Sequence, residues 1–419
     1  MKFDLLPKKK LGRIFKIIGI ILFPLTSSFF VVSIFSDGLI NKYLALPVLF
    51  IAIFSLLLLI VGHKFYKEGN DDKPRLKKRF RYPLYILALL YTIGGYTVVG
   101  LLYIPGTGFK DWLITTAMTT MTHQYYATWF YNDYDIGIVM ANNTVVESGE
   151  DTNPDLIEFS TPDFNQTSYK NEFEREIFTK DEGNDLYKII SINRYGFKGK
   201  LAVVYDPSHV KLGVSPGIGT DVDTAYGQFI TKISSNNNAP IAINASGFYD
   251  PTGNTWGGVP HGIVIANGKL VANNRKALGV GGVIGFNKEN KLILSRMTAQ
   301  QALNSGIRDC VEFGPFLIVN GKSSYINGNG GWGISARTAI GQRADGIVLL
   351  LVIDGRQIGS PGADMNDLTK IMMEYGAINA ANLDGGSSSE LVIEGKIINT
   401  PVAGGSNGLR NMSTFWVVK

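Results

Sequence analysis

Three apolar runs near the start of the chain limit most strongly what this sequence can fold into. They extend from Ile17 to Phe35, from Leu44 to Val61 and from Pro83 to Ile104. Each is close to the roughly 20 apolar residues that a helix needs to cross a bilayer. A second run follows the first at once, which favours an uncleaved anchor over a secretory signal peptide with one short apolar core. The sequence therefore predicts a membrane anchor of three transmembrane helices within residues 1–110 and argues against a soluble cytosolic enzyme.

The charge of the chain is divided unevenly between its two parts. Residues 1–110 carry 16 Lys and Arg against 5 Asp and Glu, whereas residues 111–419 carry 24 against 30. The basic residues lie before the first run and in the loop at 64–81, and positively charged loops stay in the cytoplasm. We therefore expect a multi-pass protein of the cell membrane whose C-terminal domain is extracytoplasmic. A nucleic-acid or lipid patch at 64–81 is the weaker alternative, and no nucleic-acid partner is expected.

Residues 111–185 are expected to join the anchor to a folded domain. Segment 111–131 is apolar and rich in Thr, and we interpret it as an amphipathic juxtamembrane helix on the membrane surface. A fourth membrane segment is the alternative there, and it would return the rest of the chain to the cytoplasm. Residues 132–185 are polar and acidic, which is typical of a linker or a loosely packed stalk.

The pattern of residues 186–419 predicts a folded, strand-rich domain. Short apolar runs separated by Gly, Asn and Asp predict strands, and Asn267-Gly268 predicts a hairpin turn. The segment 364–376 predicts a helix that ends at Gly376. The expected fold class is α+β, with three N-terminal transmembrane helices followed by a mixed, strand-rich α/β domain of catalytic type.

Two aspartates follow apolar runs in a strand, helix, strand pattern. The run 347–353 is apolar throughout, which predicts a strand buried on both faces, and it ends at Asp354. The helix and a second strand follow, and that strand ends at Asp384. Such a crossover makes the two strands parallel and places both aspartates at one edge of the sheet. If the strands are adjacent the carboxylates can share one substrate atom, and if a strand intervenes they serve different parts of the substrate.

The turn that begins at Asp384 also has features of an anion site. Glycines allow backbone amides to approach a ligand closely, and successive amides can cradle an anionic oxygen. Arg337 and Arg410 offer guanidinium forks for phosphate, and Ser387 adds a hydroxyl group. Each feature has a structural alternative, because Asp-Gly-Gly is a common turn and Arg337 suits a surface ion pair. Only the combination of the glycine turn, the arginines and the hydroxyl group favours an anion-binding site.

Six motifs in a fixed order resemble the phosphodiester glycosidase family. They are INASGFYD, GIVIANGKLV, FGPFLIVNGK, RTAIG, VIDGR and NLDGGSSS, within residues 186–419. The family's reaction releases a sugar from a sugar-1-phosphate diester. The resemblance implies site roles for the residues that match the family's turns and strand ends, namely Asn244, Gly247, Arg337, Thr338, Asp354, Asn382, Asp384, Gly385 and Gly386. The chain departs from the family pattern at Ser246 and Ser387, where glycine is frequent.

The expected function is that of a membrane-anchored, extracytoplasmic hydrolase of sugar-1-phosphate diesters in a surface glycan or wall polymer. Asp384, Asp354 and Arg337 are the expected catalytic residues, and Arg410 joins the expected phosphate ligands. A non-catalytic module of the same fold that binds polysaccharide or assists its export is the alternative, and an ordinary O-glycosidase is a third hypothesis. No cofactor is required, although clustered Asp and carbonyl oxygens would suit Ca²⁺ or Mg²⁺.

Overall fold

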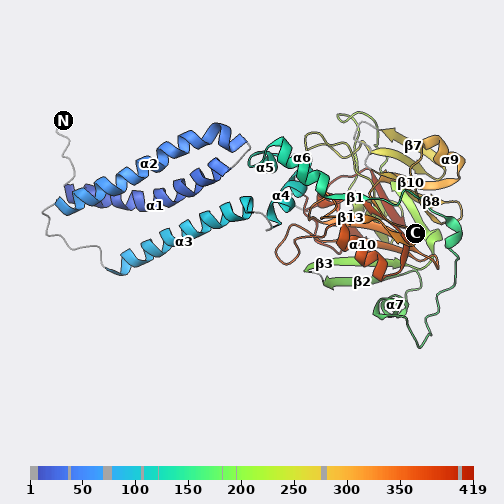
Figure 1. Cartoon of the computed structure of the whole chain (residues 1–419). Coiled ribbons are helices and arrows are strands. Elements are labelled where there is room, and N and C mark those ends of the chain that lie inside the picture. Colours follow the sequence, from blue (N-terminus) through green and yellow to red (C-terminus); the bar gives the residue numbers. More distant parts are fainter. Residues whose placement is uncertain are drawn as a thin grey trace. The chain divides into compact units, whose positions relative to one another are not determined.

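The chain forms two compact units in the computed structural model. It describes residues 8–35, 39–68, 78–104, 108–120, 122–181, 183–194, 196–274, 281–403 and 408–419. One unit comprises Met1–Met118 and His123–Met140, and the other comprises Thr119–Thr122 and Ala141–Lys419. The first is helical, in blue to teal in Figure 1, and the second is rich in strands, in green to red.

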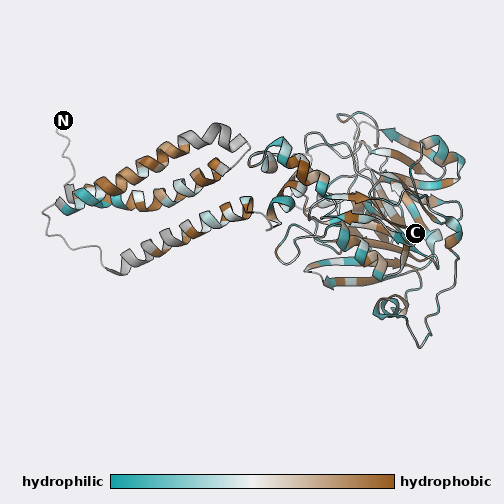
Figure 2. Ribbon diagram, in the orientation of Figure 1, coloured by the Kyte–Doolittle hydropathy of each residue, from teal (hydrophilic) through white to brown (hydrophobic). Residues whose placement is uncertain are grey.

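Two helices of the first unit are long and apolar enough to cross a membrane. They are α1 (Lys8–Phe35) and α2 (Leu39–Glu68), with candidate spans at Lys10–Ile34 and Val48–Lys67. Their apolar residues appear brown in Figure 2, and many of these side chains are exposed. Exposed apolar side chains around long helices are what a lipid environment requires.

The third predicted span is a helix, but its apolar part is shorter. Helix α3 (Lys78–Tyr103) has an apolar stretch of described residues at Ile93–Tyr103 only. Most side chains of the predicted run before Ile93 lie outside the described part of the chain, as do residues 69–77 of the basic loop. Membrane crossing by α3 therefore stays a prediction.

The segment 111–131 is neither a fourth span nor one amphipathic helix. It contains α4 (Phe109–Met118) and α5 (Tyr125–Thr128), which are separated by a break, and α6 (Asp133–Asn142) follows. Helices of 10 and 4 residues are too short to span a bilayer. Their apolar residues instead make a small core with the ends of the long helices, in which Leu102, Ile114 and Ala127 are buried.

The second unit is built from three main sheets, and every strand pair among its described residues is antiparallel. The seven-stranded sheet has the order β12-β11-β16-β14-β15-β3-β2. Its strands are β2 (Tyr187–Arg194), β3 (Phe197–Val204), β11 (Phe316–Val319), β12 (Lys322–Ser323), β14 (Arg337–Arg343), β15 (Val348–Ile353) and β16 (Ala377–Leu383).

Two five-stranded sheets and one small ribbon complete the unit. The first sheet has the order β18-β17-β5-β19-β4, with β4 (Val210–Val214), β5 (Ile241–Asn244), β17 (Leu391–Ile393), β18 (Lys396–Ile397) and β19 (Thr414–Val418). The second has the order β7-β6-β10-β8-β9, with β6 (Gly262–Ala266), β7 (Lys269–Asn274), β8 (Gly282–Asn287), β9 (Leu292–Ser295) and β10 (Ile307–Phe313). The ribbon pairs β1 (Thr144–Val146) with β13 (Tyr325–Asn327).

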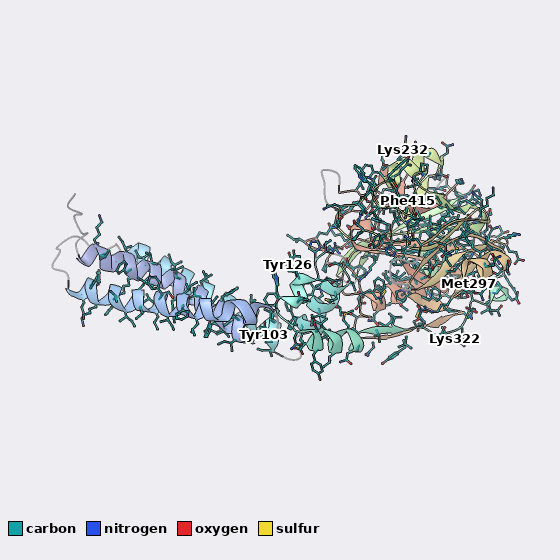
Figure 3. All side chains as sticks on the ribbon, turned by 90° about the horizontal axis from the view of Figure 1, so that it is seen from above. Tyr103, Tyr126, Lys232, Met297, Lys322 and Phe415 are labelled. Atoms are coloured by element: carbon teal, nitrogen blue, oxygen red, sulfur yellow. The ribbon has the colours of Figure 1, made fainter. Side chains whose placement is uncertain are left out.

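Strand β15 shows how the sheets are held together, and it confirms the strand buried on both faces. Val348, Leu350 and Val352 point into the core shared by the sheets, whereas Leu349 and Leu351 pack on the opposite face beneath helix α10 (Met365–Glu374). Successive side chains of a strand alternate between its faces, so a strand covered on both sides must be apolar throughout. Phe415 is buried in a separate apolar cluster with Ile230 and Ile233, whereas Lys232 and Lys322 lie at the periphery (Figure 3).

The outer faces of the sheets are covered by short helices. Helix α8 (Ile230–Asn236) packs on the β5 sheet, α9 (Ala299–Asn304) on the β10 sheet, and α7 (Glu172–Phe178) lies beside β2. Three 3-10 turns, Pro154–Leu156, Pro207–His209 and Gly386–Ser388, complete the elements. The predicted 364–376 helix is confirmed as α10, with a capping box at Asp364 and a left-handed Gly376 after its end. The hairpin at Asn267-Gly268 is confirmed as well, since it joins β6 to β7.

The second half of the predicted linker is part of the strand-rich unit. Segment 141–185 contributes β1 and α7, and it buries Ile157 and Ile177 completely. The amide of Thr152 donates to the carbonyl of Leu294, and Glu147 pairs with Arg296. The polar composition misled the prediction, because a few well-placed apolar residues are enough to fix such a segment on a sheet edge.

Strand β14 lies between the two strands that end in aspartates. It pairs with both β15 and β16 in an antiparallel register, in which Arg337 lies opposite Ile353 and Thr338 lies opposite Leu383. Strands β15 and β16 are therefore parallel to each other, as predicted, but not adjacent. Asp354 and Asp384 share one edge of the sheet with two strand spacings, roughly 10 Å, between their strands. Arg337 begins β14 at the same edge, between them.

Candidate functional site

Three arginine side chains converge on successive residues of the turn after β16. A Cβ atom built on Gly385 would lie 3.5 Å from Nη1 of Arg337, and one on Gly386 would lie 3.0 Å from Nη2 of Arg356. The third, Arg410, donates from Nη1 to the hydroxyl of Ser387 over 2.9 Å. We call this group, with Asp384 at its head, the arginine turn. It brings together the predicted Arg337, Asp384, Gly385, Gly386, Ser387 and Arg410.

Arg410 is held from several sides. Its Nη2 donates to Oδ2 of Asp250 over 2.7 Å, and its guanidinium carbon lies 4.4 Å from the ring centroid of Phe248. Asp250 is itself buried and accepts the amide of Thr255. An ion pair of this kind, stacked on an aromatic ring, fixes the guanidinium group in one orientation.

Arg337 is buried, and much of its guanidinium group serves the protein itself. Nε donates to the carbonyl of Ala363 over 3.1 Å, and Nη2 donates to the carbonyls of Gly333 and Trp332. Burial lowers the pKa of Arg337 to about 10, which leaves it positively charged at neutral pH. Only its Nη1 side faces the arginine turn, so Arg337 supplies charge there while holding two loops in place.

Asp384 is partly exposed at the head of the arginine turn. Its Oδ1 accepts the amide of Gly385 over 3.0 Å. Burial raises the pKa of Asp384, whereas a hydrogen bond with Ser388 and the nearby Arg410 and His261 act to lower it. The amide of Gly386 donates to the carbonyl of Ala336. The predicted cradle of glycine amides is therefore not free for a ligand at Gly385 or Gly386, and the positively charged groups of the arginine turn are side chains.

His261 lies close enough to Asp384 for the charge of that carboxylate to act on its ring. Its amide donates to the carbonyl of Gly247, and its Cδ2 would lie 3.5 Å from a Cβ atom built on Gly247. Burial lowers the pKa of His261, while a backbone hydrogen bond at Phe248 and the charge of Asp384 act to raise it. A histidine with a lowered pKa is neutral at pH 7 and can accept a proton.

Glu390 is a buried acid at the base of the arginine turn. The side chain is fully buried, Oε1 accepts the amide of Arg410 over 3.1 Å, and Oε2 has no hydrogen-bond partner among the described residues. Burial raises the pKa of Glu390 to about 8. The acid is therefore protonated at neutral pH, and it adds no negative charge against the arginines.

Three predicted substrate-binding residues lie beneath the arginine turn. Asn244, Thr338 and Asn382 are all fully buried. Asn244 donates to the carbonyl of Asp384 over 2.6 Å and accepts the hydroxyl of Thr338 over 2.8 Å. Asn382 donates to the carbonyl of Gly314 over 2.8 Å. In this structure Asn244 and Thr338 hold the arginine turn on the sheets, whereas Asn382 holds the turn at Gly314. The contact of all three with a substrate stays a prediction.

Gly247 and Ser246 lie on the turn that follows β5. A Cβ atom at Gly247 would lie 3.0 Å from the ring of Phe313, so a larger residue would displace that ring. Ser246 is buried, and its hydroxyl lies 2.8 Å from that of Thr414. The departure from glycine at Ser246 is thus accommodated by a hydrogen bond inside the fold.

The side chain of Asp354 forms its hydrogen bonds outside the arginine turn. Its Oδ1 accepts the amide of Thr400 over 2.7 Å and lies 3.4 Å from Nδ2 of Asn399. Burial raises the pKa of Asp354, and these two hydrogen bonds act to lower it. Asp354 is thus an anchor for the 399–400 segment, and the intervening strand β14 separates it from Asp384.

No group of three or more His, Cys, Asp or Glu side chains that could hold a metal ion occurs in the part of the chain that the structure describes. Two of the acidic side chains near the arginine turn have other contacts: Asp250 forms an ion pair with Arg410, and Glu390 is buried. The predicted Ca²⁺ or Mg²⁺ therefore has no ligand set to which we can assign it.

Four residues of this site were missed from the sequence, namely Asp250, His261, Arg356 and Glu390. All four stand inside or next to the recognised motifs: Asp250 ends INASGFYD, His261 directly precedes GIVIANGKLV, Arg356 ends VIDGR and Glu390 directly follows NLDGGSSS. Their position in those motifs was a usable signal. Their side-chain partners lie up to 160 residues away, as in the pair of Asp250 and Arg410, and no spacing rule reaches that far.

Comparisons with known proteins support the family resemblance. Residues 237–419 match the family model of phosphodiester glycosidase, which confirms the resemblance drawn from the motifs. The protein YomE of Bacillus subtilis (strain 168), a SPbeta prophage-derived uncharacterized protein, is 28% identical over 183 residues, 42% of this chain and 28% of that protein. The N-acetylglucosamine-1-phosphodiester alpha-N-acetylglucosaminidase of Bos taurus is 24% identical over 155 residues, 32% of this chain and 29% of that protein. The matches span less than a third of both relatives.

Solved structures show more distant likenesses. The catalytic domain of the zebrafish N-acetylglucosamine-1-phosphodiester alpha-N-acetylglucosaminidase, auto-inhibited by its pro-peptide, aligns with a TM-score of 0.47 and 22% identity, covering 57% of this chain and 85% of that one. A putative exported protein of Burkholderia pseudomallei K96243 aligns with a TM-score of 0.38 and 17% identity, covering 53% of this chain and 74% of that one.

Proposed function

We propose that this chain, whose residues 237–419 match the phosphodiester glycosidase family, hydrolyses the glycosidic bond of a sugar-1-phosphate diester. The observation that supports this most directly is the arginine turn. It places one partly exposed carboxylate, Asp384, beside three guanidinium groups. A sugar-1-phosphate needs both, because positive charge develops at its anomeric carbon and negative charge on the departing phosphate.

The proposed reaction divides these tasks between the two kinds of group. Water adds its oxygen to the anomeric carbon, the bond from that carbon to the phosphate oxygen breaks, and the phosphate leaves as a monoester. Asp384 supplies negative charge at the anomeric carbon, and the arginines neutralise the phosphate so that it needs no strong acid to leave. His261 is neutral and close to Asp384, and it accepts the proton that the water loses.

The membrane anchor determines where this chemistry would take place. We propose that α1, α2 and α3 all span the membrane and that the strand-rich unit, which follows α3, is extracytoplasmic and acts on glycosyl-phosphate links in a surface glycan or wall polymer. The basic residues in the first turns of α1 and in the segment that follows α2 support a cytoplasmic position for both, so that a crossing by α3 would bring the strand-rich unit outside.

The test uses the full-length chain in detergent with a UDP-sugar as the sugar-1-phosphate probe. We expect the wild-type protein to release free sugar and Asp384→Asn to lower the rate by about 10³-fold or more, because the amide cannot balance the anomeric charge. Asp155→Asn is the matched control, since Asp155 is exposed in the 3-10 turn Pro154–Leu156, and it should retain the full rate.

Two other outcomes would point to other functions. Binding of the probe without release of sugar, across a series of sugars, would favour the polysaccharide-binding or export-assisting module. Turnover of aryl glycosides that lack phosphate, at rates equal to those of phosphate esters, would favour an ordinary O-glycosidase. Either outcome would contradict the proposed use of the arginine turn.

A further inference from the structure

Arg356 differs from the other two arginines because its guanidinium group has no hydrogen-bond or ion-pair partner in the described part of the chain. Arg410 pairs with Asp250, and Arg337 donates to three carbonyl oxygens. For Arg356, by contrast, no hydrogen bond or ion pair of the side chain is found among the described residues, and the side chain is exposed. Its charge is therefore the one that is available to a ligand.

The position of this side chain is unfavourable without an anion. Nη2 of Arg356 lies over Gly386. The positive charge of Arg356 repels that of Arg337, and the positive charge of Arg410 repels that of Arg356. An exposed arginine on a free surface would extend away from two other guanidinium groups, because like charges repel. Arg356 instead folds back over the arginine turn.

The backbone of Arg356 is also unusual. Its φ is +57°, in the left-handed region that non-glycine residues seldom adopt. Such conformations cost free energy and concentrate at ligand-binding sites, where other interactions hold them. Gly386, the residue beneath the guanidinium group, has a φ of +63°, and a Cβ atom there would press on Nη2 of Arg356. The left-handed backbone of Gly386 thus leaves room for the guanidinium group of Arg356.

A second donor without an acceptor lies at the same place. The hydroxyl of Ser335 is buried and has no hydrogen-bond partner among the described residues. It lies 3.6 Å from the same Cβ position on Gly386 at which Nη2 of Arg356 lies 3.0 Å away. A buried hydroxyl without an acceptor is costly, and an oxyanion above Gly386 would satisfy both groups.

We propose that Arg356, together with the hydroxyl of Ser335, binds the phosphate group of the substrate above Gly386. This inference rests on the proposed function and refines it. Arg356 becomes the specificity-determining residue that selects a phosphate-linked sugar, whereas Arg337 and Arg410 hold the arginine turn and add positive charge. Because the negative charge of the phosphate increases as the glycosidic bond breaks, Arg356 is expected to affect kcat as well as KM.

The experiment compares three variants of the full-length chain in detergent. Arg356→Ala removes the guanidinium group, Arg356→Gly also relieves the left-handed backbone, and Gln357→Ala is a matched control on the neighbouring residue. Binding of inorganic phosphate is measured by calorimetry, and hydrolysis of a UDP-sugar is measured as kcat/KM. Thermal unfolding shows whether each variant is folded.

We expect both Arg356 variants to bind phosphate at least about 10-fold more weakly and to lose about 100-fold in kcat/KM, because charge-assisted hydrogen bonds are lost. Gln357→Ala should match the wild type. The Tm of Arg356→Gly should equal or exceed that of the wild type, because glycine adopts a φ of +57° without strain.

The two readouts separate this inference from the proposed function. Wild-type hydrolysis that Arg356→Ala leaves unchanged, together with unchanged phosphate binding, would overturn the inference and leave the glycosidase proposal standing. Phosphate binding that depends on Arg356, without any hydrolysis by the wild type, would support the inference and overturn the glycosidase. A wild-type protein that binds no phosphate would overturn the inference.

Discussion

At the scale of single residues, Glu390 shows how the site keeps its positive charge. A carboxylate this close to Arg410 would ordinarily ionise and cancel part of the charge that an anion needs. Its complete burial raises the pKa to about 8, so at neutral pH the group remains a neutral acid whose Oε1 accepts the Arg410 amide. The arginine turn thus gains a hydrogen bond without gaining a negative charge.

This burial predicts a dependence of stability on pH. The folded state keeps the proton of Glu390 up to about pH 8, whereas the unfolded state loses it near 4.5. Between these values the folded state binds more protons, so its stability falls by up to about 1.4 kcal/mol per pH unit from this group. Glu390→Gln removes the titration and should raise the Tm relative to the wild type at pH 9.

Thermal unfolding of both proteins at pH 5, 7 and 9 checks this prediction. The Tm difference should grow in favour of Glu390→Gln as the pH rises, because only the wild type has a group to ionise. Glu394→Gln, a variant of a carboxylate on the turn after β17, is the control. A Tm difference that is the same at all three pH values would contradict a buried, protonated Glu390.

At the scale of elements, strand β14 decides which predicted residues can act together. It separates the strands of Asp354 and Asp384, and it brings Arg337 to the edge between them. Asn244 then ties β5 to β14 and to the turn after β16 through Thr338 and the carbonyl of Asp384. Two sheets are thereby joined directly beneath the arginine turn.

Asp354 should therefore behave as a structural residue. Asp354→Asn keeps an acceptor for the amide of Thr400 and should change kcat/KM by less than about 5-fold, whereas loss of a catalytic carboxylate costs far more. Asp354→Ala loses the hydrogen bonds to residues 399 and 400 and should destabilise the fold by about 1–3 kcal/mol.

Kinetics with a UDP-sugar and chemical unfolding measure the two effects separately. If Asp354→Asn lost as much activity as Asp384→Asn while keeping its stability, Asp354 would be a second catalytic carboxylate. Its separation from Asp384 by β14 would then reflect two roles on different parts of one substrate.

At the scale of the whole molecule, the proposed orientation can be tested with the cysteine chemistry of the chain. Cys310 is the only cysteine, it is fully buried, and burial raises the pKa of its thiol to about 12, so it should not react with a maleimide. A cysteine placed at the exposed Lys232 reports on the strand-rich unit, and one at the exposed Lys64 reports on the C-terminal end of α2, which leads into the basic loop.

A membrane-impermeant maleimide applied to intact cells should label Lys232→Cys and leave Lys64→Cys unlabelled. Permeabilised cells should label both, which shows that both positions can react, and the wild type should stay unlabelled. Labelling of Lys64→Cys alone in intact cells would place the strand-rich unit in the cytoplasm and contradict a surface glycan as substrate.

Much of the architecture follows from local patterns in the sequence. The two long apolar helices, the β6–β7 hairpin, the capped helix α10 and the doubly buried strand β15 each arise from a periodicity, a turn residue or a cap within a few neighbouring positions. The motifs around Arg337, Asp384 and Arg410 likewise located the arginine turn. The composition of 141–185 was misleading, because composition does not show which few apolar residues find a sheet to cover.

By itself, the sequence determined the candidate membrane helices, the strand-rich character of residues 186–419 and the neighbourhood of the site, because these depend on short-range chemistry. Only the tertiary structure decided which strand lies between Asp354 and Asp384, which arginine has no side-chain partner among the residues that the structure describes, and that Glu390 is buried. Those properties depend on contacts between residues far apart in the chain and on exclusion from water, and neither can be read from neighbouring residues alone.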